Sequence, residues 1–124
     1  SNTFDIQSIN LIMKKYLMGN MNIIKQNYFK ILFLDENSLL WNRDFSNDNF
    51  NINKLRTILY KYGCKTLIIG HTPQEKGINH FGNGLVWRVD SGMSKAFGNN
   101  NKNKIQILEI IKSPQINNNI YRIK

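Results

Sequence analysis

The sequence predicts a mixed α/β fold that is helical in its first half and consists mainly of strands in its second half. Two patterns carry this prediction. Within residues 6–17 and 51–61, apolar residues are spaced as on one face of an amphipathic helix. From residue 66 on, short apolar runs end at turn-forming residues, as strands do. The chain has 124 residues, 41% of them hydrophobic, which is typical of one modest globular domain.

The first helix is expected over residues 6–17, where seven apolar residues follow mixed spacings of three and four. Gly19 then supplies the signal that ends it. Residues 21–34 are also rich in apolar side chains and are expected to begin as a second helix, but the pattern leaves the end of that helix open.

Residues 35–50 are polar and rich in turn formers, apart from the run Leu39-Leu40-Trp41, and are interpreted as a loop. A short helix is expected over residues 51–61. Asn51 has the residue type of an N-cap, and Gly63 follows as a stop signal.

Four segments of the second half have the composition of strands: residues 66–69, 85–89, 105–111 and, as a short edge strand, 119–123. The first ends at Gly70-His71-Thr72-Pro73 and the second at Asp90-Ser91-Gly92. A helical half followed by several strands fits an α+β or layered α/β unit.

Composition narrows the choice of partners. The formal net charge of +9 favours an anionic partner, but the Lys and Arg residues are scattered and only Lys14 and Lys15 are adjacent, so nucleic acid is not expected.

Asparagine is unusually frequent, and residues 99–103 are interpreted as an Asn-rich loop. Apolar runs are too short for a membrane span, and the one cysteine, Cys64, allows no internal disulfide. These features, with no visible signal peptide, favour an intracellular protein.

The segment Gly70-His71-Thr72-Pro73 is the most informative one for chemistry. A buried strand ends, a glycine lets the backbone turn, and an imidazole follows at the carboxyl end of the strand, where open α/β sheets bind ligands. Imidazole is a common ligand of divalent transition metals. Without further context a single histidine also fits a loop residue hydrogen-bonded locally, so both interpretations stay open.

Two motifs in register add that context. Three stretches resemble the last conserved block of Shewanella-like protein phosphatases: Gly70-His71-Thr72-Pro73-Gln74, then Gly77-Ile78, then Val86-Trp87-Arg88-Val89-Asp90-Ser91-Gly92-Met93-Ser94-Lys95-Ala96-Phe97-Gly98. Upstream, Leu40-Trp41-Asn42-Arg43-Asp44 resembles a segment that this family carries before that block. The family belongs to the calcineurin-like metallophosphoesterases. The resemblance implies the C-terminal half of a β-sandwich flanked by helices in αββα layers.

The resemblance also implies roles for individual residues. His71 would be a ligand of the second ion of a pair of divalent metals (Mn, Fe or Zn), and Arg43 would bind the substrate phosphate through its planar fork of donors. The alternative for Arg43 is a surface arginine paired with Asp44 or Asp48. Asp90 is a candidate by its position, since it ends a strand close to where the site is expected: it would either orient a ligand or the backbone from outside the coordination shell, or cap a turn. Trp41 and Trp87 are interpreted as packing residues, and His80 has no role that the family suggests.

The chain departs from the family in what it lacks. The GDxHG, GDxxDRG and GNHE motifs, and a further histidine before glycines, are all absent, so the chain is expected to be the C-terminal portion of a domain and inactive by itself. Joined to that missing half, it would hydrolyse phosphoserine, phosphothreonine or phosphotyrosine esters of a phosphoprotein with a metal-activated water. Alternatives are a nucleotide or dinucleotide polyphosphate hydrolase of the same superfamily, a non-catalytic basic RNA- or protein-binding module, and a degenerate paralogue acting as a scaffold.

Overall fold

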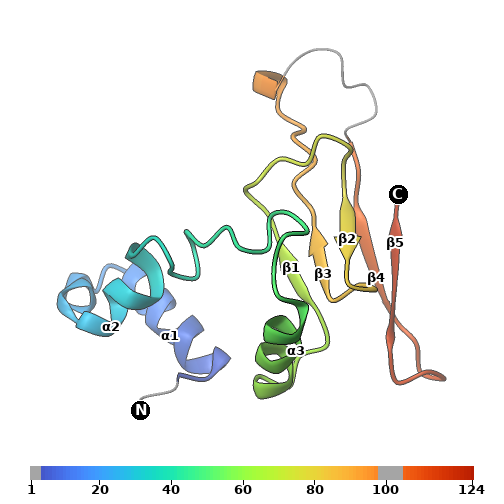
Figure 1. The fold of residues 1–124 in the computed structure, drawn as a ribbon. Helices are drawn as coiled ribbons and strands as arrows, with labels where there is room; N and C mark the ends of the chain where they lie inside the picture. The colour runs from blue at the N-terminus through green and yellow to red at the C-terminus, as the bar shows by residue number, and fades with distance from the viewer. Residues whose placement is uncertain (1–3, 98–104) are drawn as a thin grey trace. The chain divides into compact units, whose positions relative to one another are not determined.

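The computed structural model describes residues 4–97 and 105–124 (Figure 1). The chain forms two compact units, Ser1–Asp44 and Phe45–Lys124. Helices come first and strands follow, which confirms the mixed α/β class and its order. The Asn-rich stretch 99–103 lies outside the described residues.

The first unit begins with helix α1 (Ile6–Leu17), as the periodicity predicts. Asp5 caps its N-terminus, because the carboxylate accepts a hydrogen bond of 2.7 Å from the backbone N–H of Ser8. Gly19 follows the helix with φ +90°, a backbone conformation that glycine adopts without steric cost.

The second apolar segment of this unit is not one helix. It divides into a 3-10 turn η1 (Met21–Lys25), a short helix α2 (Asn27–Phe29) and a π turn η2 (Lys30–Leu34), so the end that the sequence leaves open is Leu34. The break falls at Gln26, whose backbone is extended. These turns and α1 enclose an apolar cluster of Ile12, Ile23, Phe29 and Phe33.

The second unit begins with a loop and helix α3 (Ile52–Lys61), again as predicted. The Asn51 side chain accepts hydrogen bonds from the N–H groups of Asn53 and Lys54, at 3.0 and 3.1 Å, and is the expected N-cap. Leu55 and Leu59 are the buried residues of this helix, and they pack in one cluster with Val86.

A three-stranded sheet lies beside α3, in the order β1 (Leu67–Ile69), β3 (Val86–Arg88), β2 (Asn79–Phe81). β1 runs parallel to β3, and β2 runs antiparallel to it. β1 and β3 fall within the predicted strands. The sequence does not predict β2, because its residues Asn-His-Phe lack an apolar run and form a strand only through pairing with β3.

The remaining strands form an antiparallel hairpin, β4 (Leu108–Lys112) and β5 (Asn119–Ile123). The edge strand over 119–123 is confirmed. The prediction of 105–111 began three residues too early and ended one too early, although Ile107 still exchanges backbone hydrogen bonds of 2.8 and 2.9 Å with Lys124. A 3-10 turn η3 (Lys95–Phe97) precedes the hairpin.

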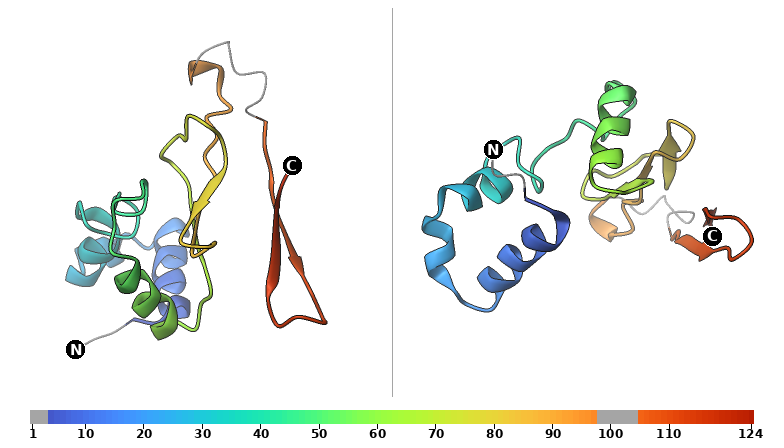
Figure 2. Two further views of the ribbon diagram at one scale, coloured as in Figure 1. Left: turned by 45° about the vertical axis from the view of Figure 1, so that its right-hand side comes forward. Right: turned by 90° about the horizontal axis from the view of Figure 1, so that it is seen from below.

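Strand β3 joins the three layers of this unit. Successive side chains of a strand point to opposite faces. Val86 therefore faces the leucines of α3, while Trp87 faces the hairpin and stacks on Tyr121, with ring centroids 5.3 Å apart. The helix and the hairpin thus cover opposite faces of the sheet (Figure 2). Trp87 is a packing residue, 6% exposed, as predicted; Trp41 is 54% exposed, so the prediction that it packs is wrong.

A second tie holds the hairpin to the sheet. The backbone N–H of Ile78 donates to Oε1 of Gln106, at 2.7 Å. The neighbouring Gly77, with φ +83°, leaves room for this amide, since a Cβ at that position would lie 2.1 Å from Oε1. Glycine at position 77 therefore follows from the close approach of the segment that leads into the hairpin.

Candidate functional site

His71 lies in the loop that follows β1. Gly70 separates it from the strand, and its own φ of 66° is in the left-handed region, which non-glycine residues seldom adopt. Its side chain is exposed. Left-handed conformations of ordinary residues are found preferentially at functional sites, because the surrounding structure has to hold them there. An exposed imidazole held in this way is accessible to a metal ion.

The loop that carries Asp90 lies next to the His71 loop. β1 and β3 are parallel, so their carboxyl ends meet at one edge of the sheet. Two backbone hydrogen bonds join the segments there: Val89 N–H to Ile69 O, at 2.9 Å, and Gln74 N–H to Asp90 O, at 2.8 Å. The structure therefore brings two of the three predicted site residues to the same edge.

The Asp90 side chain has a local partner. Its carboxylate oxygen Oδ1 accepts a hydrogen bond of 2.9 Å from the N–H of Gly92, which is the turn-capping arrangement that was the alternative interpretation. The other carboxylate oxygen is not used in this turn. A role for Asp90 in orienting a metal ligand stays a prediction.

Arg43 lies in the first unit, at its end. One guanidinium nitrogen, Nη1, is shared among three neighbouring carbonyl oxygens, those of Leu40, Trp41 and Asn42, at 3.4, 3.1 and 3.3 Å. The side chain is exposed and caps the turn that the Leu-Trp-Asn-Arg-Asp motif forms. Arg43 and His71 belong to different units, and the expectation that both face one substrate stays a prediction.

Sequence reasoning missed Arg88, a buried charged side chain of the second unit. It is 5% exposed and donates four hydrogen bonds. The acceptors are the backbone oxygens of Phe45 and Asn47, at 2.8 and 2.7 Å, and the side-chain oxygens of Asp48 and Asn79, at 2.8 and 3.0 Å. A charged residue inside the apolar run 85–89 is the signal that could have revealed it.

Arg88 fixes the site indirectly. Asn79, which accepts from Arg88, donates in turn to Oε1 of Gln74, at 2.9 Å. Gln74 is the residue whose backbone N–H bonds to Asp90, and its side-chain amide also donates to Thr72 O, at 2.9 Å. A chain of hydrogen bonds therefore runs from the buried guanidinium to the residue that follows His71.

The metal-binding capacity of this edge is limited. Among residues 4–97 and 105–124, no three His, Cys, Asp or Glu side chains are grouped so that they could hold a metal ion. A structural zinc site takes four protein ligands and a catalytic one takes three. The residues present therefore fit the role of one ligand in a shared site and do not fit a closed metal site.

The chain matches no protein-family model, and no solved structure matches it. No helix among the described residues is both long enough and apolar enough to cross a membrane.

Proposed function

We propose that the chain contributes one metal ligand, His71, and a phosphate-binding arginine, Arg43, to a two-metal protein phosphatase. One observation carries the proposal: an exposed imidazole in a left-handed conformation follows β1 at the edge where the parallel strand β3 also ends. This is the edge at which α/β sheets bind ligands. The sequence resemblance around His71 and Arg43 supports the same assignment.

The proposed division of labour follows from the residue types. Pairs of divalent ions in hydrolases supply a bound hydroxide and neutralise phosphate oxygens. His71 would hold one ion, through a ring nitrogen that makes no hydrogen bond to a described residue. Arg43 would bind phosphate oxygens because the planar fork of its guanidinium donors matches their geometry. The other metal ligands would come from outside this chain. We therefore propose that they belong to the other half of an αββα sandwich, which this chain would complete.

The metal-binding step can be tested on the chain of 124 residues. A substoichiometric NMR titration with Cu²⁺, a paramagnetic ion that imidazole binds well, is expected to broaden the His71 ring signals and the amide signals of residues 70–72 and 90–92 first. This pattern follows because paramagnetic broadening depends on proximity to the ion and imidazole is a preferred ligand. His71→Ala should abolish the local broadening.

The second histidine supplies a matched control. His80 is also exposed, but it lies on β2 with its ring 4.6 Å from that of Trp87. His80→Ala should leave the broadening at residues 70–72 unchanged. Broadening centred on His80, or unaffected by His71→Ala, would remove His71 from the proposal. The catalytic step needs an upstream segment with the absent motifs: joined to it, the His71→Ala chain should contain fewer metal ions by elemental analysis and hydrolyse phosphoesters more slowly.

A further inference from the structure

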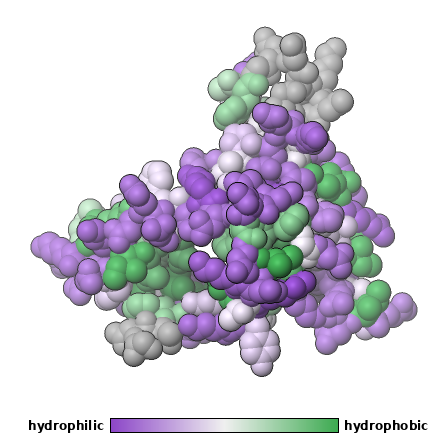
Figure 3. Space-filling view, in the orientation of Figure 1, coloured by the Kyte–Doolittle hydropathy of each residue, from purple (hydrophilic) through white to green (hydrophobic). Residues whose placement is uncertain are grey.

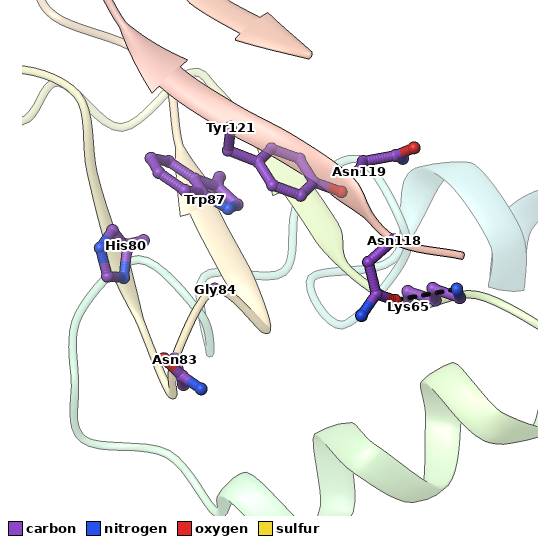
Figure 4. Close-up of a pocket in the computed structure, with 8 residues that line it drawn as sticks. All are labelled: Lys65, His80, Asn83, Gly84, Trp87, Asn118, Asn119 and Tyr121. Carbon is purple, nitrogen blue, oxygen red and sulfur yellow. Dashed lines mark hydrogen bonds between the residues drawn. The ribbon is translucent and has the colours of Figure 1, made fainter. Parts of the chain in front are cut away.

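A hollow of about 390 Å³ lies on the hairpin side of the sheet in the second unit (Figure 4). Lys65 and Gly84, which line it, lie two residues before the starts of β1 and β3. The hollow is thus near the amino ends of the two parallel strands, whereas His71 and Asp90 follow their carboxyl ends. Its volume is within the range of small-molecule sites. None of the residues that line it is acidic.

Trp87 supplies a hydrogen-bond donor that has no acceptor. The side chain is 6% exposed, and its indole Nε1–H is buried without a partner among the described residues. Buried tryptophan N–H groups usually have a partner, because an unsatisfied donor loses its hydrogen bond to water. In Figure 4 the indole nitrogen is directed toward the space above Gly84.

Gly84 keeps that space open. Its φ is +82°, and a Cβ built on it would have a single neighbour within 4 Å, the Trp87 Nε1 atom at 3.5 Å. An acceptor atom that entered over Gly84 would therefore lie close to the indole nitrogen.

The second donor of the hollow is the side-chain NH₂ group of Asn118, and Lys65 sets its orientation. Its ammonium nitrogen donates to the backbone oxygen of Asn117 and to Oδ1 of Asn118, the latter at 3.0 Å. An ammonium group only donates, so it fixes which end of the Asn118 amide is the oxygen. The Asn118 NH₂ group is left directed toward the hollow, as Figure 4 shows. Both acceptors of Lys65 are neutral, so its positive charge is not compensated by them.

The charge of the unit acts in the same direction. Twelve of the 17 Lys and Arg residues but only four of the eight Asp and Glu residues lie in residues 45–124, so this part has a formal net charge of +8. A positive field around a site that contains donors and no carboxylate raises the local concentration of anions.

We infer that this hollow binds a small organic anion, whose phosphate or carboxylate oxygen accepts hydrogen bonds from Trp87 Nε1–H and the Asn118 amide while its body fills the remaining space beside His80 and Tyr121. The size of the hollow requires a body, because a bare phosphate ion would leave most of it unfilled. The inference does not depend on the role of His71.

The test is an NMR titration of the 124-residue chain with phenyl phosphate, benzoate and inorganic phosphate at constant ionic strength set by chloride. The reporter is the indole N–H resonance of Trp87, which should move downfield and saturate with a Kd of about 1 mM or below for phenyl phosphate or benzoate. The tighter of the two identifies the head group. The Trp41 indole signal, on the exposed tryptophan, should stay in place.

Asn118→Asp is the decisive variant. It keeps the oxygen that Lys65 contacts, replaces the donor with a carboxylate, and lies at an exposed position where folding should be retained. Affinity should fall about tenfold or more. Asn53→Asp, the same substitution on α3 at the opposite face of the sheet, should leave it unchanged. Lack of a saturable shift with both organic anions, equal binding of inorganic phosphate, or unchanged affinity in Asn118→Asp would overturn the inference.

Discussion

Different interactions stabilise the interior of each of the two units. In the first, the core is one apolar cluster in which Phe29 contacts the rings of Tyr16 and Phe33, each with centroids 5.1 Å away. Its polar pairs, such as Asp5 with Ser8, join residues that are close in sequence. In the second, Arg88 bonds to a loop about 40 residues before it, and Lys65 to residues more than 50 positions after it.

Exposed apolar surface also distinguishes the units. Among the described residues, ten large apolar side chains are exposed in each unit, although the first unit is little more than half as long as the second. Figure 3 shows hydrophobic patches of this kind on a face that is otherwise mostly hydrophilic. The first unit thus has less buried apolar surface to offset the entropy of ordering its chain. We therefore expect the stability of the first unit to depend on a few aromatic contacts, and that of the second unit on a network of long-range hydrogen bonds.

The largest effect is expected from breaking the aromatic cluster. Phe29 is 2% exposed, so Phe29→Ala should lower the free energy of unfolding of the first unit by about 3–5 kcal/mol. Urea denaturation followed by residue-resolved NMR should show the midpoint falling for residues 4–44 and not for 45–124. Leu17→Ala, at a 74% exposed position in the same unit, is the control and should change little. An equal fall in both units would show that they unfold as one.

Removal of Arg88 tests the network of the second unit. Arg88→Met should cost about 3 kcal/mol, because four acceptors lose their donor while the apolar stem is retained. Asp48→Asn is the matched control: the Asp48 side chain is 63% exposed, so loss of its charge should cost less than about 1 kcal/mol. Denaturation monitored by Trp87 fluorescence in a Trp41→Phe background would measure both. Equal costs would mean that the ion pair, and not the bonds to backbone oxygens, dominates.

The sequence predicts the elements that have a strong local signal. Helices α1 and α3 have apolar periodicity, and a glycine follows shortly after the end of each. Strands β1 and β3 lie within recognisable apolar runs. The division of residues 21–34 into short turns has no such signal. Apolar residues lie on both sides of Lys25-Gln26-Asn27, and a polar run of this length also fits the exposed face of one amphipathic helix, although the backbone is extended at Gln26. β2 is defined by its partner β3 and has no pattern of its own.

The candidate site is predictable to a similar degree. The Gly70-His71 motif after an apolar run predicts a histidine just beyond the carboxyl end of a strand, and the structure places it there, after β1. The parallel pairing that brings the Asp90 loop to the same edge depends on the sheet order, and the network of Arg88 depends on long-range contacts. Neither has a local signature. The hollow at the other end is built by β5 folding over Trp87, which likewise appears only in three dimensions.

The smallest expected effect compares the caps of the two long helices. Asp5 caps α1 and Asn51 caps α3, and only the first titrates. The hydrogen bonds to Ser8 lower the pKa of Asp5 below its ordinary value of 3.8. The stabilisation by this charged cap is therefore complete above the unfolded-state pKa, declines as the pH falls below it, and is lost below the folded-state pKa.

Over that acidic range, the urea midpoint of the first unit should fall in the native chain. In Asp5→Asn, which keeps a capping oxygen but cannot titrate, that fall should be smaller, whereas the second unit should respond identically in both chains. An unchanged acid response in Asp5→Asn would show that other carboxylates determine it, and that the contrast between the caps has no bearing on how the two units differ.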